Sequence, residues 1–196
     1  MSKVAMLFAS REGQTQKIIE RMRQVVARAG HDVELIHLEG PEIKIRLEQY
    51  DAFVLGSSVR YGRHHDFFCR FVEQNATVLN SKPCYFFSVN LTARKANRSE
   101  PHQNPYLTKY LCYSSLCPDS VEVFAGAFKL SQYGFFQKQL LSLIMKVSDG
   151  STAPNEDREF TDWCRVIRFA ERFTQHLAGD QVSTRAADVN HQVAFA

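Results

Sequence analysis

Hydrophobic residues along the chain gather in short runs that alternate with longer segments of helical periodicity. The runs predict five strands, at residues 3–8, 32–38, 52–57, 83–89 and 120–128. The segments between and after them predict helices at residues 18–29, 42–49, 65–75, 106–113 and 161–177. The first and third runs are almost wholly apolar, as in strands that are buried on both faces of a parallel sheet. This alternation predicts an α/β domain with helices on both faces of the sheet.

A polar turn, Ser-Arg-Glu-Gly-Gln-Thr at residues 10–15, joins the first strand to the first helix. The first N–H groups of a helix lack partners within it and favour an anion, and Gly13 allows a tight turn. Ser10, Gln14 and Thr15 add side-chain donors. The spacing fits neither the P-loop nor the three-glycine dinucleotide fingerprint. The turn therefore predicts a site for a phosphate monoester, and the alternative for this stretch alone is an ordinary hydroxyl-capped helix start.

Two further loops that begin with serine follow the third and fourth predicted strands, at residues 57–62 and 88–91. In open parallel sheets, ligands bind beyond the carboxyl ends of the strands, where the strand order reverses. We therefore expect the three loops to converge on one edge of the sheet.

These three loops resemble the phosphate loop and the two ring-flanking loops of flavodoxin-like FMN proteins. Within that superfamily, the motifs at residues 10–15, 58–62, 88–95, 143–146 and 160–163 are similar to those of the menaquinone-dependent protoporphyrinogen IX dehydrogenases of bacteria. The resemblance covers residues 4–177. It implies a flavodoxin-like, doubly wound, five-stranded parallel sheet of order 2-1-3-4-5. It also implies oxidation of protoporphyrinogen IX to protoporphyrin IX in haem biosynthesis, with electrons passed to menaquinone or ubiquinone.

The resemblance also assigns residues to a non-covalently bound FMN. The phosphate would be held by Ser10, Arg11, Gly13, Gln14 and Thr15. The ring would be wrapped by Ser57, Ser58, Val59, Arg60, Tyr61, Gly62, Ser88, Val89, Asn90, Leu91, Thr92 and Ala93. Tyr61 is the candidate for stacking on the ring, and the alternative is a surface tyrosine.

The sequence contains no Ser-His-Asp set, paired carboxylates or metal-ligand cluster, so we assign no certain catalytic residue. This agrees with chemistry that the flavin itself performs. His64 and His65 are candidate proton acceptors, unless they are simply solvated. Arg63, Arg94 and Lys95, together with Arg60 and Arg98, are candidates for binding the propionates of a porphyrinogen, unless they form a solubilising rim.

We expect one domain at residues 1–178, with an inserted excursion at residues 129–159 and a disordered tail at residues 179–196. Within the excursion, residues 135–147 predict an apolar helix with a narrow polar stripe. Thirteen residues span about 20 Å, less than the ~30 Å of a bilayer core. The helix would lie on a membrane or cover a hydrophobic substrate, and the alternative is a second core helix.

Composition narrows the function further. The 196 residues carry a formal net charge of +3, which suits an anionic membrane surface or substrate, and no nucleic-acid-binding motif accompanies it. The chain shows neither a secretory leader nor a bilayer-spanning run, and its five cysteines are scattered. We expect a peripheral protein on the cytoplasmic side of the inner membrane, with homo-oligomerisation left open. The alternative functions are a flavodoxin-type electron carrier, an NAD(P)H:quinone reductase and a flavin-free interaction domain.

Overall fold

A computed structural model describes residues 1–40, 45–128 and 157–193, and side chains as far as residue 179. Its main sheet has five parallel strands in the spatial order β2-β1-β3-β5-β6. These are β2 (Asp32–His37), β1 (Lys3–Ala9), β3 (Ala52–Arg60), β5 (Cys84–Asn90) and β6 (Ser120–Ala125). Counted along the chain, this is the predicted order 2-1-3-4-5, and the flavodoxin-like fold is confirmed.

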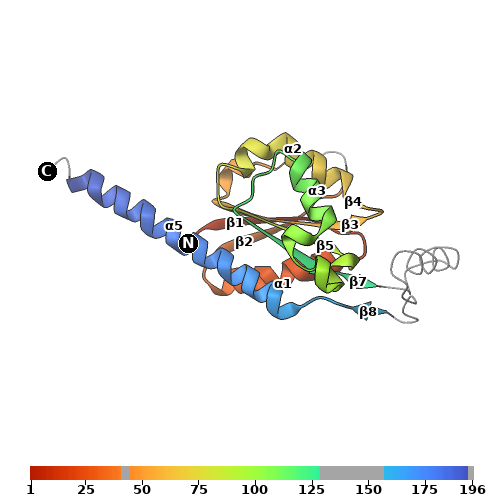
Figure 1. Cartoon of the computed structure of the whole chain (residues 1–196). Coiled ribbons are helices and arrows are strands. Elements are labelled where there is room, and N and C mark those ends of the chain that lie inside the picture. Colours follow the sequence, from red (N-terminus) through yellow and green to blue (C-terminus); the bar gives the residue numbers. More distant parts are fainter. Residues whose placement is uncertain (41–44, 129–156, 194–196) are drawn as a thin grey trace.

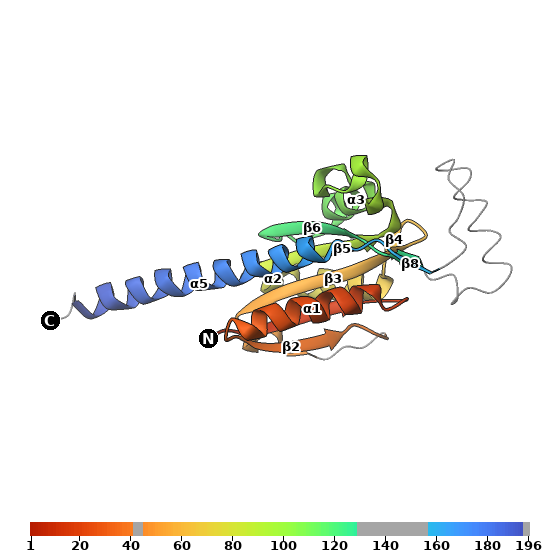
Figure 2. The same ribbon diagram turned by 90° about the horizontal axis from the view of Figure 1, so that it is seen from below.

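Helices cover both faces of this sheet (Figures 1 and 2). α1 (Gln14–Arg28) and α5 (Trp163–Val193) lie on one face, and α2 (Asp66–Leu79) and α3 (Pro105–Tyr113) lie on the other. Four 3-10 turns complete the described elements: η1 (Leu47–Gln49), η2 (Leu91–Arg94), η3 (Ala96–Arg98) and η4 (Pro101–Gln103). Among the described residues, no helix combines the length and the apolar character needed to cross a bilayer.

The central strands are apolar throughout because each of their faces packs against a helical layer. In β1, Val4, Met6 and Phe8 face the α1 and α5 layer, and the alternate residues face the α2 and α3 layer. The sheet leaves no room for a side chain at Gly56, because a Cβ there would lie 2.3 Å from Cζ of the buried Phe87.

The third strand is longer than predicted. β3 continues to Arg60 and doubles back as β4 (Arg63–His64), which pairs with it in antiparallel fashion. Tyr61 and Gly62 form the turn with φ values of 51° and 77°, the geometry of a two-residue type I′ hairpin. The open loop that we expected at residues 57–62 is therefore largely a hairpin. A tyrosine in the left-handed region gives no sequence signal for such a turn.

The fifth predicted strand, at residues 120–128, is two strands. β6 ends at Ala125, and after Gly126 the short β7 (Ala127–Phe128) pairs with β8 (Arg158–Glu159). The carbonyl of Gly126 accepts a hydrogen bond from the backbone of Phe160 rather than extending the main sheet. Most of the excursion expected at residues 129–159, including its predicted helix, lies outside the described residues.

Two predicted helix limits are wrong. In the segment predicted as a helix at residues 42–49, the described part is helical only at Leu47–Gln49, because Arg46 is extended (φ −87°, ψ 92°). The last helix begins at Trp163 and continues to Val193, beyond the predicted end at residue 177. Gly179 does not stop it, because no proline follows and the later residues are compatible with a helix. The backbone at 179–193 is thus helical where we expected a disordered tail, whereas the domain limits stay a prediction.

Candidate functional site

The polar turn after β1 has the geometry of an anion site. Gly13 adopts φ 81°, and the Ser10 hydroxyl accepts a hydrogen bond of 3.1 Å from its N–H. The turn leads directly into α1, whose first residues Gln14 and Thr15 are buried. The N-terminus of α1 therefore faces the carboxyl-terminal edge of the sheet, where free N–H groups and the helix dipole favour a phosphate.

Three buried polar atoms at this edge have no hydrogen-bond partner among the described residues. They are Thr15 Oγ1, Ser58 Oγ and the Gln14 side-chain oxygen. Buried polar groups are nearly always paired, so orphaned atoms at the carboxyl ends of two neighbouring strands indicate a missing ligand. The Thr15 hydroxyl and the N-terminus of α1 are donors that a phosphate needs, so they fit the phosphate of FMN. The Ser58 hydroxyl belongs to the loop that we assigned to the ring, and the Gln14 oxygen is an acceptor that calls for a donor.

Gln14 is held in place by Thr161, which lies two residues before α5. Its amide nitrogen donates to Thr161 Oγ1 over 2.9 Å, and Thr161 donates to the carbonyl of Ala125 over 2.7 Å. Asp162, the next residue, caps the start of α5 by accepting from Arg165 N over 3.0 Å. Thr161 therefore fixes the amide of Gln14 against the end of β6.

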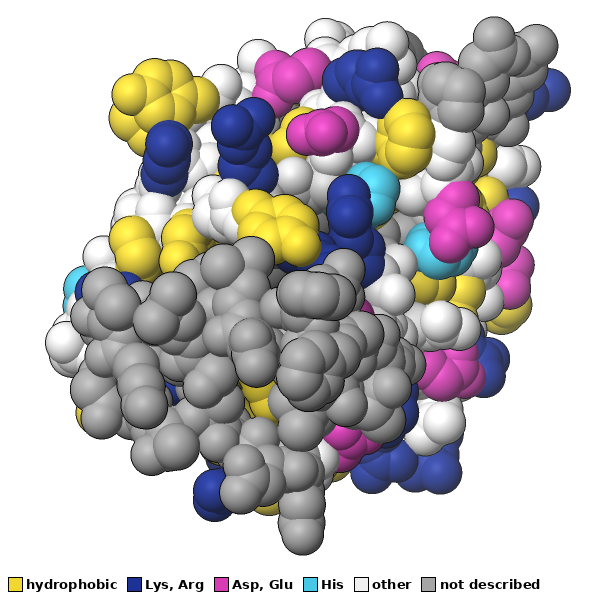
Figure 3. All heavy atoms as spheres, turned by 90° about the vertical axis from the view of Figure 1, so that its right-hand side faces the viewer, with side chains coloured by type: hydrophobic (Ala, Val, Ile, Leu, Met, Phe, Trp, Pro, Cys, Tyr) yellow, Lys and Arg dark blue, Asp and Glu magenta, His cyan; other side chains and the backbone are white. Residues whose placement is uncertain are grey.

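A cationic cavity of about 240 Å³ joins the first two predicted loops. It is lined by Arg11, Ser58, Arg60, Tyr61, Arg63, His64, His65 and Asp66. Figure 3 looks onto this edge, where Lys and Arg side chains lie beside histidine and exposed hydrophobic side chains. With three arginines and one carboxylate, the cavity favours an anionic ligand.

An ion pair of 3.7 Å between Arg60 and Glu12 connects the hairpin to the phosphate turn. The side chain of Tyr61 is 79% exposed, and the guanidinium of Arg60 lies 5.2 Å from its ring centre. An exposed ring at the hairpin tip agrees with both the stacking role and the surface alternative.

The third loop continues through η2, η3 and η4 to residue 104, and we use the name for this whole segment. It is organised by a buried pair of amides. Asn90 and Asn104 exchange hydrogen bonds of 3.3 and 3.1 Å. Asn90 Oδ1 also accepts from the hydroxyl of Thr92 and from the N–H of Ala93, while Asn104 caps α3. The Asn90 side chain therefore shapes the loop, and Asn104 is a structural residue that our sequence analysis missed. The Asn-Pro dipeptide indicates a helix cap, but nothing in the sequence pairs Asn104 with Asn90.

The two candidate proton acceptors differ in environment. His64 is buried, its Nε2 lies 2.9 Å from Ser88 Oγ, and burial lowers the pKa of its imidazole to about 4. Such a group stays neutral near pH 7 and links the hairpin to β5. His65 is half-buried, its Nδ1 has no partner among the described residues, and burial and Arg11 lower its pKa. Of the two, His65 is better placed to receive a proton.

The predicted substrate cations do not share one cavity. Arg63 lines the cationic cavity with Arg11 and Arg60. Arg94 and Lys95 lie outside its lining, at the end of η2, where Arg94 donates to the carbonyl of Leu91 over 2.9 Å. Cationic groups therefore lie on both the hairpin and the third loop.

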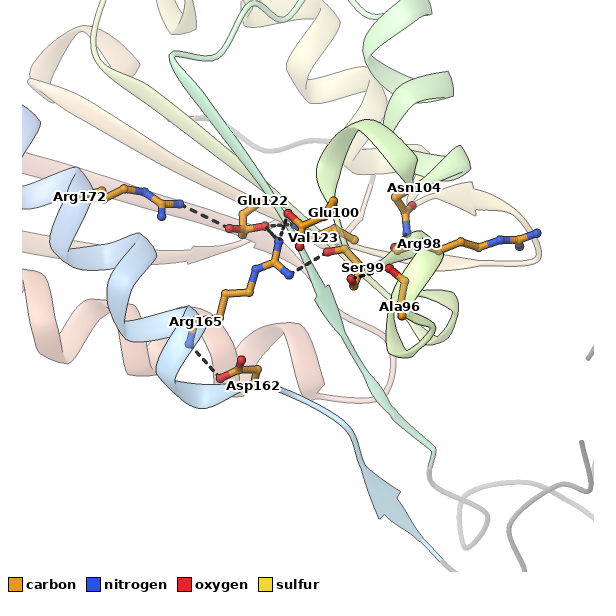
Figure 4. A network of polar contacts seen from close by, with 10 residues as sticks. All are labelled: Ala96, Arg98, Ser99, Glu100, Asn104, Glu122, Val123, Asp162, Arg165 and Arg172. Atoms are coloured by element: carbon orange, nitrogen blue, oxygen red, sulfur yellow. Dashed lines mark hydrogen bonds and ion pairs between the residues drawn. The ribbon is translucent and has the colours of Figure 1, made fainter.

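A network of ion pairs and hydrogen bonds connects the third loop to β6 and α5 (Figure 4). Glu122 of β6 is 5% exposed and pairs with Arg165 at 2.5 Å and with Arg172 at 3.4 Å, both from α5. Arg165 also donates to the carbonyl of Ser99 over 2.8 Å and pairs with Glu100 at 3.2 Å. Arg165, which belongs to α5, therefore connects residues 99 and 100 of the third loop to β6.

Comparison with known proteins agrees with this architecture. A family model described as a flavodoxin domain matches residues 5–155. The flavodoxin 1 structure of Bacillus cereus matches with a TM-score of 0.55 and 20% identity, covering 89% of this chain and 99% of that one. The rubredoxin oxygen:oxidoreductase of Desulfovibrio gigas matches with a TM-score of 0.53 and 11% identity, covering 90% of this chain and 36% of that one. These structural matches establish the fold alone.

Two curated relatives are more similar in sequence. The protoporphyrinogen IX dehydrogenase [quinone] of Escherichia coli K12 is 39% identical over 178 residues, which covers 89% of this chain and 96% of that protein. The protein of the same name from Leishmania major is 37% identical over 175 residues, which covers 87% of this chain and 74% of that protein. With its flavodoxin-like sheet, the chain therefore belongs to the protoporphyrinogen IX dehydrogenase (quinone) family.

Proposed function

We propose that this protein oxidises protoporphyrinogen IX to protoporphyrin IX and passes the electrons to a quinone, with FMN as its cofactor. The observation that carries the proposal is the 39% identity to the E. coli dehydrogenase over nearly the full length of both proteins. The reaction removes six electrons and six protons from the porphyrinogen, so three quinones become three quinols for each porphyrin formed.

The phosphate turn supplies the cofactor site in this proposal. The hydroxyl of Thr15 donates to the phosphate, together with N–H groups after Gly13 at the start of α1, and the hydroxyl of Ser58 is left for the ring. When bound, FMN accepts and returns electrons in pairs, which is chemistry that no side chain of this chain supplies.

The remaining residues position the substrate and accept protons. Arg63 on the hairpin and Arg94 and Lys95 on the third loop form charge-assisted hydrogen bonds with the two propionates of the porphyrinogen. His65 is the candidate that receives a proton released at the hairpin side of the site, because its Nδ1 is unpartnered in the described structure. Asn90 and Asn104 keep the third loop rigid, which keeps its cations in register with those of the hairpin.

We also propose a membrane quinone, menaquinone or ubiquinone, as the acceptor and the cytoplasmic face of the inner membrane as the site of action. The net charge of +3 and the apolar sequence at residues 135–147 support peripheral binding to an anionic bilayer. Co-sedimentation with anionic and with neutral liposomes tests this part. Equal recovery in the supernatant with both kinds of liposome would contradict it.

The main experiment follows the visible absorption of the FMN-loaded protein under anaerobic conditions. Addition of protoporphyrinogen IX should bleach the flavin band while porphyrin absorption appears, and a naphthoquinone should restore the band. A flavin that stays oxidised with porphyrinogen would overturn the proposal. Bleaching by NADPH instead would identify an NAD(P)H:quinone reductase.

A further inference from the structure

A second cavity lies behind the hairpin, between α2 and α3, and we call it the tyrosine groove. Its volume is about 330 Å³. It is lined by Gly62, Arg63, His64, Asp66, Cys69, Glu73, Tyr106, Lys109, Tyr110, Tyr113 and Ser114. This volume is at the lower end of the usual range for ligand pockets, about 300–1,000 Å³. The groove therefore has room for a ligand of one or two rings.

Tyr110 gives the groove an unused donor. Its hydroxyl is buried and makes no hydrogen bond of good geometry with the described residues, since the nearby Ser114 hydroxyl donates to Glu73 over 2.7 Å. Burial raises the pKa of Tyr110 well above its usual value, so the hydroxyl stays protonated and is a neutral donor at physiological pH. An acceptor oxygen bound in the groove would satisfy it.

The groove carries little net charge, unlike the cavity on the other side of the hairpin. Arg63 and Lys109 are matched by Asp66 and Glu73 in its lining. The neighbouring cavity has three arginines and one carboxylate. Charge complementarity thus directs the propionates of a porphyrinogen to the cationic cavity and an uncharged ligand to the groove.

The groove also lies next to the predicted cofactor loops. The ring centre of His64 lies 4.7 Å from that of Tyr110, and His64 Nε2 lies 2.9 Å from Ser88 Oγ on the third loop. Gly62, at the hairpin turn, belongs to the second loop and to the groove lining. A ligand in the groove would therefore be separated from the third loop by one imidazole.

From these observations we propose that the tyrosine groove binds the head group of the quinone acceptor. A quinone is planar and uncharged, its rings suit aromatic walls, and its carbonyl oxygen accepts the hydrogen bond of Tyr110. The proposal rests on the proposed function, which supplies the quinone as a substrate. Each bound quinone takes up two electrons and two protons from porphyrinogen oxidation and leaves as a quinol.

Direct binding tests the site without turnover. The probe is 2,3-dimethyl-1,4-naphthoquinone, whose substituted ring carbons keep it from reacting with the free cysteines, and its affinity for oxidised, FMN-loaded protein is measured by calorimetry. Tyr110→Phe should weaken binding about five- to tenfold through loss of one hydrogen bond. Tyr106→Leu, which removes an aromatic wall, should also weaken it. The matched control is Tyr50→Phe, which also removes a tyrosine hydroxyl and its hydrogen bond but lies outside the groove lining, and it should leave the affinity unchanged.

The experiments distinguish an error in the proposed quinone site from an error in the proposed function. No saturable binding to the native protein, or unchanged affinity in both Tyr110→Phe and Tyr106→Leu, would overturn the groove as the quinone site. Slower flavin bleaching by porphyrinogen in Tyr110→Phe, with unchanged quinone affinity, would identify a tetrapyrrole site instead. If porphyrinogen fails to bleach the native flavin while Tyr110→Phe still weakens quinone binding, the function fails and the site stands.

Discussion

The side chains of Gln14 and Thr161 are hydrogen-bonded at 2.9 Å, although 147 positions separate them in the chain. The bond leaves the Gln14 oxygen buried and unpartnered, beside a turn that has the geometry of a phosphate site. Because Thr161 also donates to the carbonyl of Ala125, it fixes this amide relative to the sheet. Thr161 is therefore a positioning residue for the phosphate turn.

Thr161→Val should weaken FMN binding by about five- to tenfold, because it removes one hydrogen bond that holds Gln14. Riboflavin lacks the phosphate, so its affinity should change much less. Titration of the apoprotein with each flavin, followed by quenching of flavin fluorescence, measures both affinities. Thr161→Ser keeps the hydroxyl and is the matched control. An equal loss for FMN and riboflavin would show that Thr161 does not act through the phosphate turn.

Gly56→Ala should lower the free energy of unfolding by about 1–3 kcal/mol, the usual cost of overpacking a core. The new Cβ would lie 2.3, 2.6 and 2.9 Å from three ring atoms of Phe87, whose side chain is fully buried. Urea unfolding measures the effect. The control is Gly126→Ala, where the nearest heavy atom would be Val89 Cγ1 at 3.4 Å. We expect that variant to change stability by less than about 1 kcal/mol, since alanine also restricts the unfolded chain. Equal effects of the two variants would rule out the close approach to Phe87 as the cause.

The sequence predicted the sheet well because its strands carry an unambiguous signal. Strands β1, β3 and β5 are buried on both faces, so they are continuous apolar runs that no amphipathic helix imitates. The phosphate turn was predictable for a similar reason, since Gly13 and its hydroxyl neighbours lie at a strand-to-helix junction. Both features depend on residues that are close together in the chain.

Features that depend on distant residues were not predictable. Thr161 looks like a helix cap, and only the folded sheet brings it to Gln14. The partnership of Asn90 with Asn104 likewise depends on how the third loop folds back. The sequence did not predict the hairpin turn because Tyr61 adopts the left-handed backbone conformation, which residues other than glycine rarely adopt. Local pattern therefore predicted the candidate site, and tertiary contacts decide how its side chains are held.

Burial of His64 should make stability depend on pH in a defined window. Its pKa falls from 6.5 to about 4 on folding, so between these values the unfolded chain binds the proton and the folded protein does not. The contribution of His64 to the free energy of unfolding is therefore fully present above about pH 6.5 and is lost as the pH falls towards 4. The total loss is about 3 kcal/mol. His64→Gln does not titrate and should flatten this part of the profile. Urea unfolding of both proteins at pH 7, 5.5 and 4.5 provides the comparison, and parallel profiles would contradict the assignment.

Arg165→Met should lower the free energy of unfolding by about 2–4 kcal/mol, because removing one partner of a buried ion pair leaves the other uncompensated. Of its two arginines Glu122 would keep only Arg172, at 3.4 Å, beside the N–H of Val123, and the carbonyl of Ser99 would lose its donor. The control is Arg172→Met, whose side chain is half exposed and whose loss should cost less than about 1 kcal/mol.

The same ion pair predicts the behaviour of a double variant. Combining Arg165→Met with Glu122→Gln removes the buried charge together with its partner. The double variant should therefore lower the free energy of unfolding by less than the sum of the two single changes. Faster hydrogen exchange at residues 98–101 in Arg165→Met, but not in Arg172→Met, should accompany the loss, because only Arg165 reaches the third loop. Additive energies together with unchanged exchange would mean that Arg165 neither compensates Glu122 nor anchors the loop that carries Arg94 and Lys95.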